Sequence, residues 1–343
     1  MPAEPKTVSW PAISRWLLPL LVSLAALLIV FHQVDLAQFS AALGRISAGR
    51  LLLASGLFIA GLLLRALSWK LMLGNAFSFG TAFAGLNAGY LLNNILPFRL
   101  GDVGRALLLT GDGKQQRPFG EVFATIITER VLDVFIGSVF LLLSVRWLSD
   151  QPALRAAALA GVLLMCVVML LAGLAARHQQ QVIDFLERKL PAKPFWQTRV
   201  LHFLDETLTG FHFFTQPARW IPAALLLIFS WGFSMVQLGV LQQDVLNGSS
   251  WFWPMLVVSA GAFINALPSA PAGMGVFEAA VVGAYALLGV ANGPALALGL
   301  VLHAFQFIIP SLFGTVGLVA LNKNPGQFLS RVWNRAPKPG GSQ

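Results

Sequence analysis

Long apolar runs separated by short polar segments dominate the pattern of this chain of 343 residues. Six runs are continuous enough to be interpreted as membrane-spanning helices, because roughly 20 helical residues cross the hydrocarbon core of a bilayer. The six predicted spans are residues 16–31, 51–73, 124–148, 156–176, 221–241 and 295–321. The first is the shortest and follows a basic flank like a signal peptide, but no small-residue cleavage site follows it promptly, which favours an uncleaved helix.

Two further apolar stretches, residues 81–110 and 251–290, are interrupted by a repeated pattern. Asn-x-Leu-Pro begins at Asn94 and again at Asn265, and glycines follow it both times. Proline and glycine end helices, so the pattern predicts two broken helices in two related halves, a common arrangement around a site inside a bilayer. The residues predicted to form the breaks are Pro97, Gly101, Pro268, Pro271, Gly273 and Gly275.

The distribution of basic residues indicates how these stretches enter the membrane. The limb that follows the first break has only about a dozen residues, too few to span, which favours a re-entrant hairpin. With that hairpin, the basic termini and the polar segment 177–219 fall on one side, as the positive-inside rule prefers for the cytoplasm. The second stretch then enters from the opposite side, although two short full spans would give the same orientation.

We therefore expect an all-α, multi-pass protein of the cell membrane with both termini in the cytoplasm. About six full spans and two re-entrant hairpins, eight apolar segments in all, would form an inverted pseudo-repeat. The expected organisation is a cytoplasmic tail (residues 1–15), a membrane domain (16–321) and a basic tail (322–343) rich in Pro and Gly and disordered near anionic headgroups. Segment 177–219 is amphipathic and is expected along the cytoplasmic surface, with a plain connector as the alternative.

Composition supports the membrane class and narrows the chemistry. The chain is 57% hydrophobic and 11% charged, against roughly 25% charged for a soluble domain. Its net charge of +9 comes from basic residues between apolar runs. Basic residues in these positions indicate how the spans are oriented in the membrane and do not indicate nucleic-acid binding. Cys166 is the sole cysteine and is expected to be a small core residue, and the histidines show no metal-binding spacing. We expect no metal, no other cofactor and, without a Walker loop, no ATP hydrolysis.

Ionisable residues inside apolar segments are the candidate functional residues, because a charge at the bilayer centre costs about 3 kcal/mol. They form three groups: Arg99, Asp102 and Arg105 after the first break; Glu129, Arg130 and Asp133 on one helical face; and Glu278 after the second break. Each new helix after a break has free N–H groups that could bind a phosphate, and an arginine would add a bidentate fork. The acids would neutralise the arginines, bind a cationic group or carry a coupling proton.

A structural role is the alternative for each candidate. The charged residues could form satisfied ion pairs, Glu278 could be a favourable first-turn acid, and Asn94 and Asn265 could cap the breaks instead of binding substrate. Arg65 and Lys70 are expected to extend toward the cytoplasmic interface. His303 and Gln306 favour interhelical hydrogen bonding over a site role.

Three motifs in order resemble the lysylphosphatidylglycerol synthase transmembrane family, also called flippase-like. They are Asn94-Ile-Leu-Pro-Phe-Arg-Leu-Gly-Asp-Val-Gly-Arg105, Thr128-Glu-Arg-Val-Leu-Asp133 and Pro268-Ser-Ala-Pro-Ala-Gly-Met-Gly-Val-Phe-Glu278. The resemblance covers roughly residues 14–321 and implies a lipid translocator with the charged residues of these motifs in its site. Asp102 and Ala272 depart mildly from the family pattern, where Glu and Gly are frequent. The chain ends at Gln343, so we expect no soluble aminoacyl-transferase domain.

The leading hypothesis is a translocase that moves an anionic phospholipid or a lipid-linked polyprenyl-phosphate or glycolipid intermediate between leaflets, and is not an enzyme. The headgroup of the lipid would lie between the N-termini of the helices that follow the two breaks. Two alternatives stay open: an intramembrane lipid transferase that uses an acidic residue as base, and a scaffold for a separate lipid synthase or glycosyltransferase. Nucleic acid is not an expected partner.

Overall fold

The fold of the chain is helical throughout the part that the computed structural model describes. This part comprises residues 24, 25, 28, 32, 34–96, 98–110, 117–145, 152–191, 195–264 and 270–321. It contains no β-strand and only an isolated bridge between Thr110 and Arg117. The expected all-α class is therefore confirmed. The α-helices are α2 (Leu36–Arg45), α3 (Ala48–Leu73), α4 (Phe79–Ile95), α5 (Leu100–Leu109), α6 (Phe119–Ser144), α7 (Pro152–Arg177), α8 (Gln179–Lys189), α9 (Leu201–Phe211), α10 (Pro217–Val245), α11 (Trp253–Ile264), α12 (Val276–Ala286) and α13 (Asn292–Ala320).

Four helices are long and apolar enough to cross a membrane, and they match four of the predicted spans. These are α3, α7, α10 and α13. Helix α6 matches a fifth prediction and has 26 residues, but it carries three ionisable side chains near its middle. Residues 16–31, predicted as the first span, lie almost wholly outside the described residues, and the two predicted tails, 1–15 and 322–343, lie outside them entirely.

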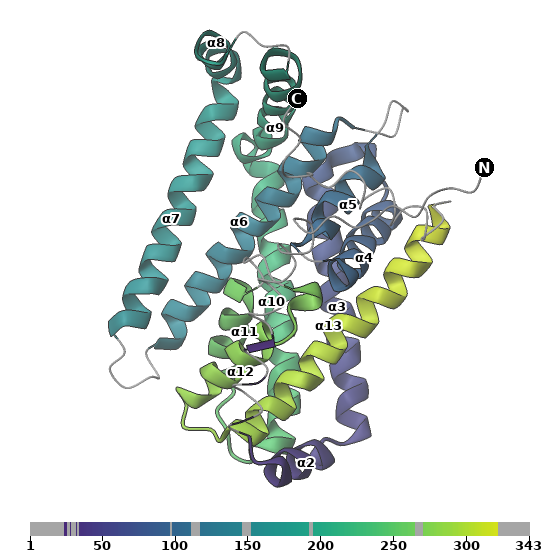
Figure 1. Ribbon diagram of the computed structural model, residues 1–343, viewed down its shortest axis with the longest axis vertical. Coiled ribbons are helices and arrows are strands. Elements are labelled where there is room, and N and C mark those ends of the chain that lie inside the picture. The colour runs from purple at the N-terminus through teal and green to yellow at the C-terminus, as the bar shows by residue number, and fades with distance from the viewer. Residues whose placement is uncertain are drawn as a thin grey trace, which may run out of the picture.

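Two pairs of short helices occupy opposite halves of the molecule. Helices α4 and α5 pack together as a first hairpin, and α11 and α12 pack together as a second hairpin. Figure 1 shows the first hairpin in the upper half and the second in the lower half, with α13 running beside both. Helices α5, α11 and α12 have 10, 12 and 11 residues, so each is only about 15–18 Å long, well short of a bilayer.

The first hairpin turns through an unusual backbone. Leu96 is extended, and Phe98 and Arg99 both have positive φ, 54° and 55°, which non-glycine residues rarely adopt. Helix α5 then approaches α4 so closely that a Cβ on Gly101 would lie 2.0 Å from the carbonyl oxygen of Gly89. Gly101 is therefore required by close approach of two helices, and the break itself lies at the residues before it.

The second hairpin turns through the predicted glycines. A short 3₁₀ turn spans Pro271–Gly273, and Ala272, Gly273 and Gly275 all have positive φ. This turn contacts α4, so the second hairpin lies against the first at its turn. The predicted break residues Pro97 and Pro268, and also Asn265, lie outside the described residues.

Small residues let the two halves approach one another. A Cβ on Gly314 of α13 would lie 2.4 Å from the carbonyl oxygen of Asn87 in α4, and one on Gly317 would lie 2.9 Å from the Cα of Ala84. Close packing over small residues is the usual way in which membrane helices associate. Helices α4 and α13, far apart in sequence, thereby bring the first hairpin onto the helix that also supports the second.

One expectation about the periphery is wrong, and another stays a prediction. The apolar face of α9 packs against α6, and Glu206 of α9 accepts a hydrogen bond from the backbone N–H of Gly120 at the start of α6. The expected position of segment 177–219 along the cytoplasmic surface stays a prediction. Cys166 is exposed and not in the core, because α7 packs mainly on α6 and leaves most of its apolar surface free. Figure 1 shows α7 at the edge of the helical body.

Candidate functional site

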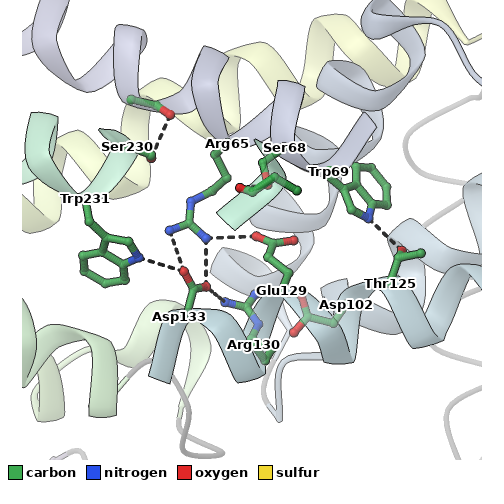
Figure 2. Close-up of polar contacts among 12 residues, drawn as sticks. Arg65, Ser68, Trp69, Asp102, Thr125, Glu129, Arg130, Asp133, Ser230 and Trp231 are labelled. Carbon is green, nitrogen blue, oxygen red and sulfur yellow. Dashed lines mark hydrogen bonds and ion pairs between the residues drawn. The ribbon is translucent and has the colours of Figure 1, made fainter. Parts of the chain in front are cut away.

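Four arginines and three acids form a buried network where α3, α5 and α6 meet. Arg65 comes from α3, Arg105 and Asp102 from α5, and Arg99 from the residue just before α5. The helix α6 supplies Glu129, Arg130 and Asp133 from one face. The charged residues after the first break and those on α6 were predicted as two separate groups. The structure brings them together in one cluster, which Figure 2 shows in part.

Arg65 joins the two α6 acids of this network. Its NH1 and NH2 atoms donate to Asp133 Oδ2 and Oδ1, both at 2.8 Å, and NH1 also donates to Glu129 Oε1 at 2.9 Å. Trp231 of α10 donates from Nε1 to Asp133 Oδ1 at 2.9 Å. Figure 2 shows Arg65 directed between Trp231 and Glu129. The expectation that Arg65 extends to the interface is wrong, because two buried carboxylates hold it inward.

Arg105 is the most enclosed of the arginines. Its exposure is 0%, and so is that of its partner Glu129, whose Oε2 atom lies 2.7 Å from Arg105 NH2. The guanidinium also lies 4.7 Å from the ring centroid of Trp69, within the range of a cation–π interaction. The ion pair and the indole together hold Arg105 in place behind the residues that line the cavity.

Asp102 is surrounded by arginines. Its carboxylate accepts a hydrogen bond from Arg130 NH2 at 3.1 Å, and the Nε atoms of Arg99 and Arg105 lie 3.8 and 3.9 Å away. Arg130 NH1 also lies 3.6 Å from Asp133. Four guanidinium groups thus share three carboxylates, which leaves one positive charge in excess among the described members of the network.

A cavity of about 200 Å³ lies beside this network and between the two hairpin turns. A water molecule takes roughly 30 Å³ in the liquid, so the cavity has room for a group of several heavy atoms. Arg99 and Arg130 line it, and the Nε atom of each is buried without a hydrogen-bond partner. Other lining residues from the first half are Phe58, Arg65, Tyr90, Asn93, Asn94 and Asp133, and the second half contributes Ala270, Ala272, Gly273, Phe277, His303 and Gln306.

The second break contributes a separate polar pair. Glu278 Oε2 accepts a hydrogen bond from the N–H of Gly275 at 2.7 Å, which caps the start of α12, and Glu278 Oε1 contacts Nδ1 of His303 in α13. Glu278 forms no ion pair with the four arginines, so it does not neutralise them in the way expected of the acids in the motifs. The predicted interhelical bond of His303 is confirmed, and through His303 this pair reaches the cavity.

Side chains of the protein itself cap the N-termini of α5 and α12, the helices that follow the two breaks. Asn93, not Asn94, caps α5 by accepting a hydrogen bond from the N–H of Gly101 at 2.8 Å. Asn94 instead donates to Ser311 and to the carbonyl of Phe307 in α13. An anion in the cavity would therefore meet arginine side chains before free helix N-termini. Among the described residues, no cluster of His, Cys, Asp and Glu could hold a metal ion.

Sequence reasoning missed several residues of the site. Trp231, Tyr90 and Gln237 line the cavity, but each lies within a helix whose pattern is apolar overall. The signal that could have found two of them is the stripe Ser230, Ser234 and Gln237 with Trp231 on α10, polar residues at helical spacing inside a span.

Comparison with known proteins identifies the family of the chain. The profile of the family described as lysylphosphatidylglycerol synthase TM region matches residues 16–314. The UPF0104 membrane protein MJ1595 of Methanocaldococcus jannaschii is 23% identical over 274 residues, which cover 74% of this chain and 80% of that protein. No solved structure matches the chain significantly. The profile covers most of the chain and all the described motifs, so this integral, multi-pass membrane protein belongs to the lysylphosphatidylglycerol synthase transmembrane-region family.

Proposed function

We propose that this protein translocates a lipid with an anionic, phosphate-bearing headgroup between the leaflets of the cell membrane. The observation that carries the proposal is the excess arginine charge beside the central cavity. Arg99 and Arg130 both line the cavity, and each has a buried Nε–H without an acceptor. A phosphate oxygen would satisfy such donors, and a guanidinium binds phosphate in a fixed, directional geometry.

The arrangement of the two hairpins supports movement across the membrane. Their turns meet at the cavity, while their helices extend from it into opposite halves of the molecule. Binding sites of many transporters lie at such an interface between inverted repeats. We propose that the hairpins are re-entrant from opposite faces, so that small movements of one half against the other would open the cavity to each leaflet in turn.

The state of the acidic residues favours translocation over lipid-transfer chemistry. Asp102, Glu129 and Asp133 are each paired with arginine, and Glu278 is held by His303 and a helix N-terminus. A general base needs access to the proton that it removes. These carboxylates are engaged with the protein itself, which suits a role in positioning the arginines.

Reconstitution into phosphatidylcholine vesicles tests the proposal. Tail-labelled phosphatidic acid in the outer leaflet is quenched by dithionite, and the rate at which protected lipid becomes accessible gives the rate of exchange. We expect the wild type to accelerate exchange at least tenfold over protein-free vesicles. Arg99→Gln should remove most of the acceleration, because it removes the cavity cation with the weakest internal partner, Asp102 at 3.8 Å.

A matched control is Arg155→Gln, which removes an arginine from α7, away from the cavity. It should leave the rate unchanged. Exchange that equals the protein-free rate, or that is the same for Arg99→Gln and wild type, would contradict the proposal.

A further inference from the structure

The cavity has a second, uncharged end. Helix α10 carries Trp231, which bonds to Asp133 of the arginine network, and six residues further along it carries Gln237. Six residues correspond to about 9 Å along a helix. Because α10 continues toward α11, Gln237 lies on the side of the second hairpin. The cavity thus extends well beyond the arginines.

The residues around this second end differ in chemistry from the arginine network. Among the described residues that line the cavity on this side, only His303 has an ionisable side chain, and several are apolar. They include Val257, Gly261, Phe277, Val281 and Leu302. The polar groups among them are Ser234, Gln237 and Gln306. A neutral wall with a few polar groups is typical of a pocket that orients an uncharged part of a ligand.

Gln237 is the unexplained member of this wall. It is only 2% exposed, and its Nε2 atom is buried without a hydrogen-bond partner. A buried polar group without a partner costs about 1–3 kcal/mol, so such groups normally have an acceptor. A hydroxyl both donates and accepts, and it can therefore satisfy the amide of Gln237 directly.

Among the described residues, this end offers no free carboxylate to a cationic group. An ammonium would need a carboxylate with a free lone pair directed into the cavity. Glu278 is bonded to the cavity-lining His303, but His303 and the N–H of Gly275 engage its two oxygens. Asp133 is held by Arg65 and Trp231. All the buried, partnerless atoms on cavity-lining side chains that the structure describes are donors: the Nε atoms of Arg99 and Arg130, and Nε2 of Gln237.

We infer that the Gln237 end is a hydroxyl-binding subsite, and that the protein selects a phosphate headgroup bearing a glycerol- or sugar-type hydroxyl over one bearing an ammonium. The inference rests on the proposed function, since it assigns the phosphate of the same headgroup to Arg99 and Arg130. The two subsites together would recognise the headgroup at two points. The arginines would bind its phosphate charge, and Gln237 would bind its hydroxyl groups.

The wild-type protein tests the inference without any substitution. Tail-labelled phosphatidylglycerol, phosphatidic acid and phosphatidylethanolamine are compared in the same phosphatidylcholine vesicles. Phosphatidylglycerol presents a phosphate with hydroxyls, phosphatidic acid presents a bare phosphate, and phosphatidylethanolamine presents a phosphate with an ammonium. We expect phosphatidylglycerol to move about fivefold faster than phosphatidic acid, the effect of one satisfied hydrogen bond, and phosphatidylethanolamine to move slowest.

Gln237→Met then removes the amide while it keeps the volume of the side chain. It should abolish the preference for phosphatidylglycerol over phosphatidic acid, and Gln181→Met on the exposed face of α8 should retain it. Phosphatidic acid serves as an internal measure of folded, active protein in each preparation.

Equal rates for phosphatidylglycerol and phosphatidic acid in the wild type, or an unchanged ratio of these rates in Gln237→Met, would overturn the hydroxyl-binding subsite but leave the proposed function in place. Phosphatidylethanolamine that moves fastest would have the same consequence. If no lipid moves faster than in protein-free vesicles, the proposed function fails, and the inference fails with it.

Discussion

Arg65 and Asp133 form a two-bonded ion pair between α3 and α6, with both guanidinium–carboxylate distances at 2.8 Å. The side chains are only 12% and 8% exposed. Trp231 bonds to the same carboxylate from α10, so this pair ties together three helices that surround the cavity. This ion pair gives Asp133 a structural role and orients the side chain of Arg65 toward the cavity.

Asp133→Asn should strongly destabilise the protein. The substitution leaves the buried Arg65 with Glu129 as its remaining anionic partner, a carboxylate that Arg105 already engages. Breaking a buried ion pair typically costs 3–5 kcal/mol, so we expect a loss of about 3 kcal/mol in the free energy of unfolding. Denaturant or thermal unfolding in detergent, followed by tryptophan fluorescence, measures it.

Glu121→Gln provides the comparison within the same helix. Its carboxylate pairs with Arg117 at 2.8 Å, but the arginine is 40% exposed. An exposed pair contributes less than about 1 kcal/mol. If Asp133→Asn proves no more destabilising than Glu121→Gln, the ion pair does not support the site.

Gly101→Ala should disrupt the first hairpin. The added Cβ would lie 2.0 Å from the carbonyl oxygen of Gly89 and 2.6 Å from the backbone nitrogen of Asn93. Both contacts are with backbone, so α5 must move away from α4, at a cost of about 3 kcal/mol or more. The Arg105–Glu129 bond would be lost with it, and thermal unfolding together with exchange assays should show both effects.

Gly56→Ala is the matched control for that substitution. Gly56 lies in α3, and a Cβ added to it would meet no neighbouring atom within 4 Å. Alanine in an open helical site is neutral or stabilising by up to about 1 kcal/mol. Similar stability of the two alanine variants would show that α5 does not pack on α4 as described.

The proposed orientation predicts opposite accessibility for two surface positions. Gln181 in α8 and Asn247 after α10 are both exposed, and Figure 1 shows these segments at opposite ends of the molecule. In a Cys166→Ala background, Asn247→Cys should react with a charged, impermeant maleimide in spheroplasts. Gln181→Cys should react only after the membrane is permeabilised. The reverse pattern would invert the orientation, and labelling of both from one side would refute it.

Much of the fold could be predicted because apolar runs and helix breaks have local causes. The boundaries of α3, α10 and α13 differ from the predicted spans by only a few residues. The short second limb of the first hairpin was predicted from the apolar run of only about a dozen residues after the predicted break, and α5 has 10 residues. The positions of charges along the chain likewise identified every acid of the arginine network.

The rest depended on which helices meet, and sequence alone does not give that. Arg65 lies eight residues before the end of α3, where a lone arginine in a span normally extends to the interface; its pairing requires α6 to lie beside α3. Asn93 and Asn94 point to different helices although they are neighbours, because α4 presents them on different faces. Glu278 was expected near the arginines, but α13 supplies His303 as a closer partner.

In the proposed function, the cavity between the two hairpin turns binds the headgroup of an anionic lipid. The most direct measurement is an experimental structure of the protein in nanodiscs that contain phosphatidylglycerol. We expect phosphate density within hydrogen-bonding distance of Arg99 and Arg130, and loss of that density in Arg99→Gln. A cavity without headgroup density, while ordered lipid occupies only the outer surface of the helices, would contradict the claim.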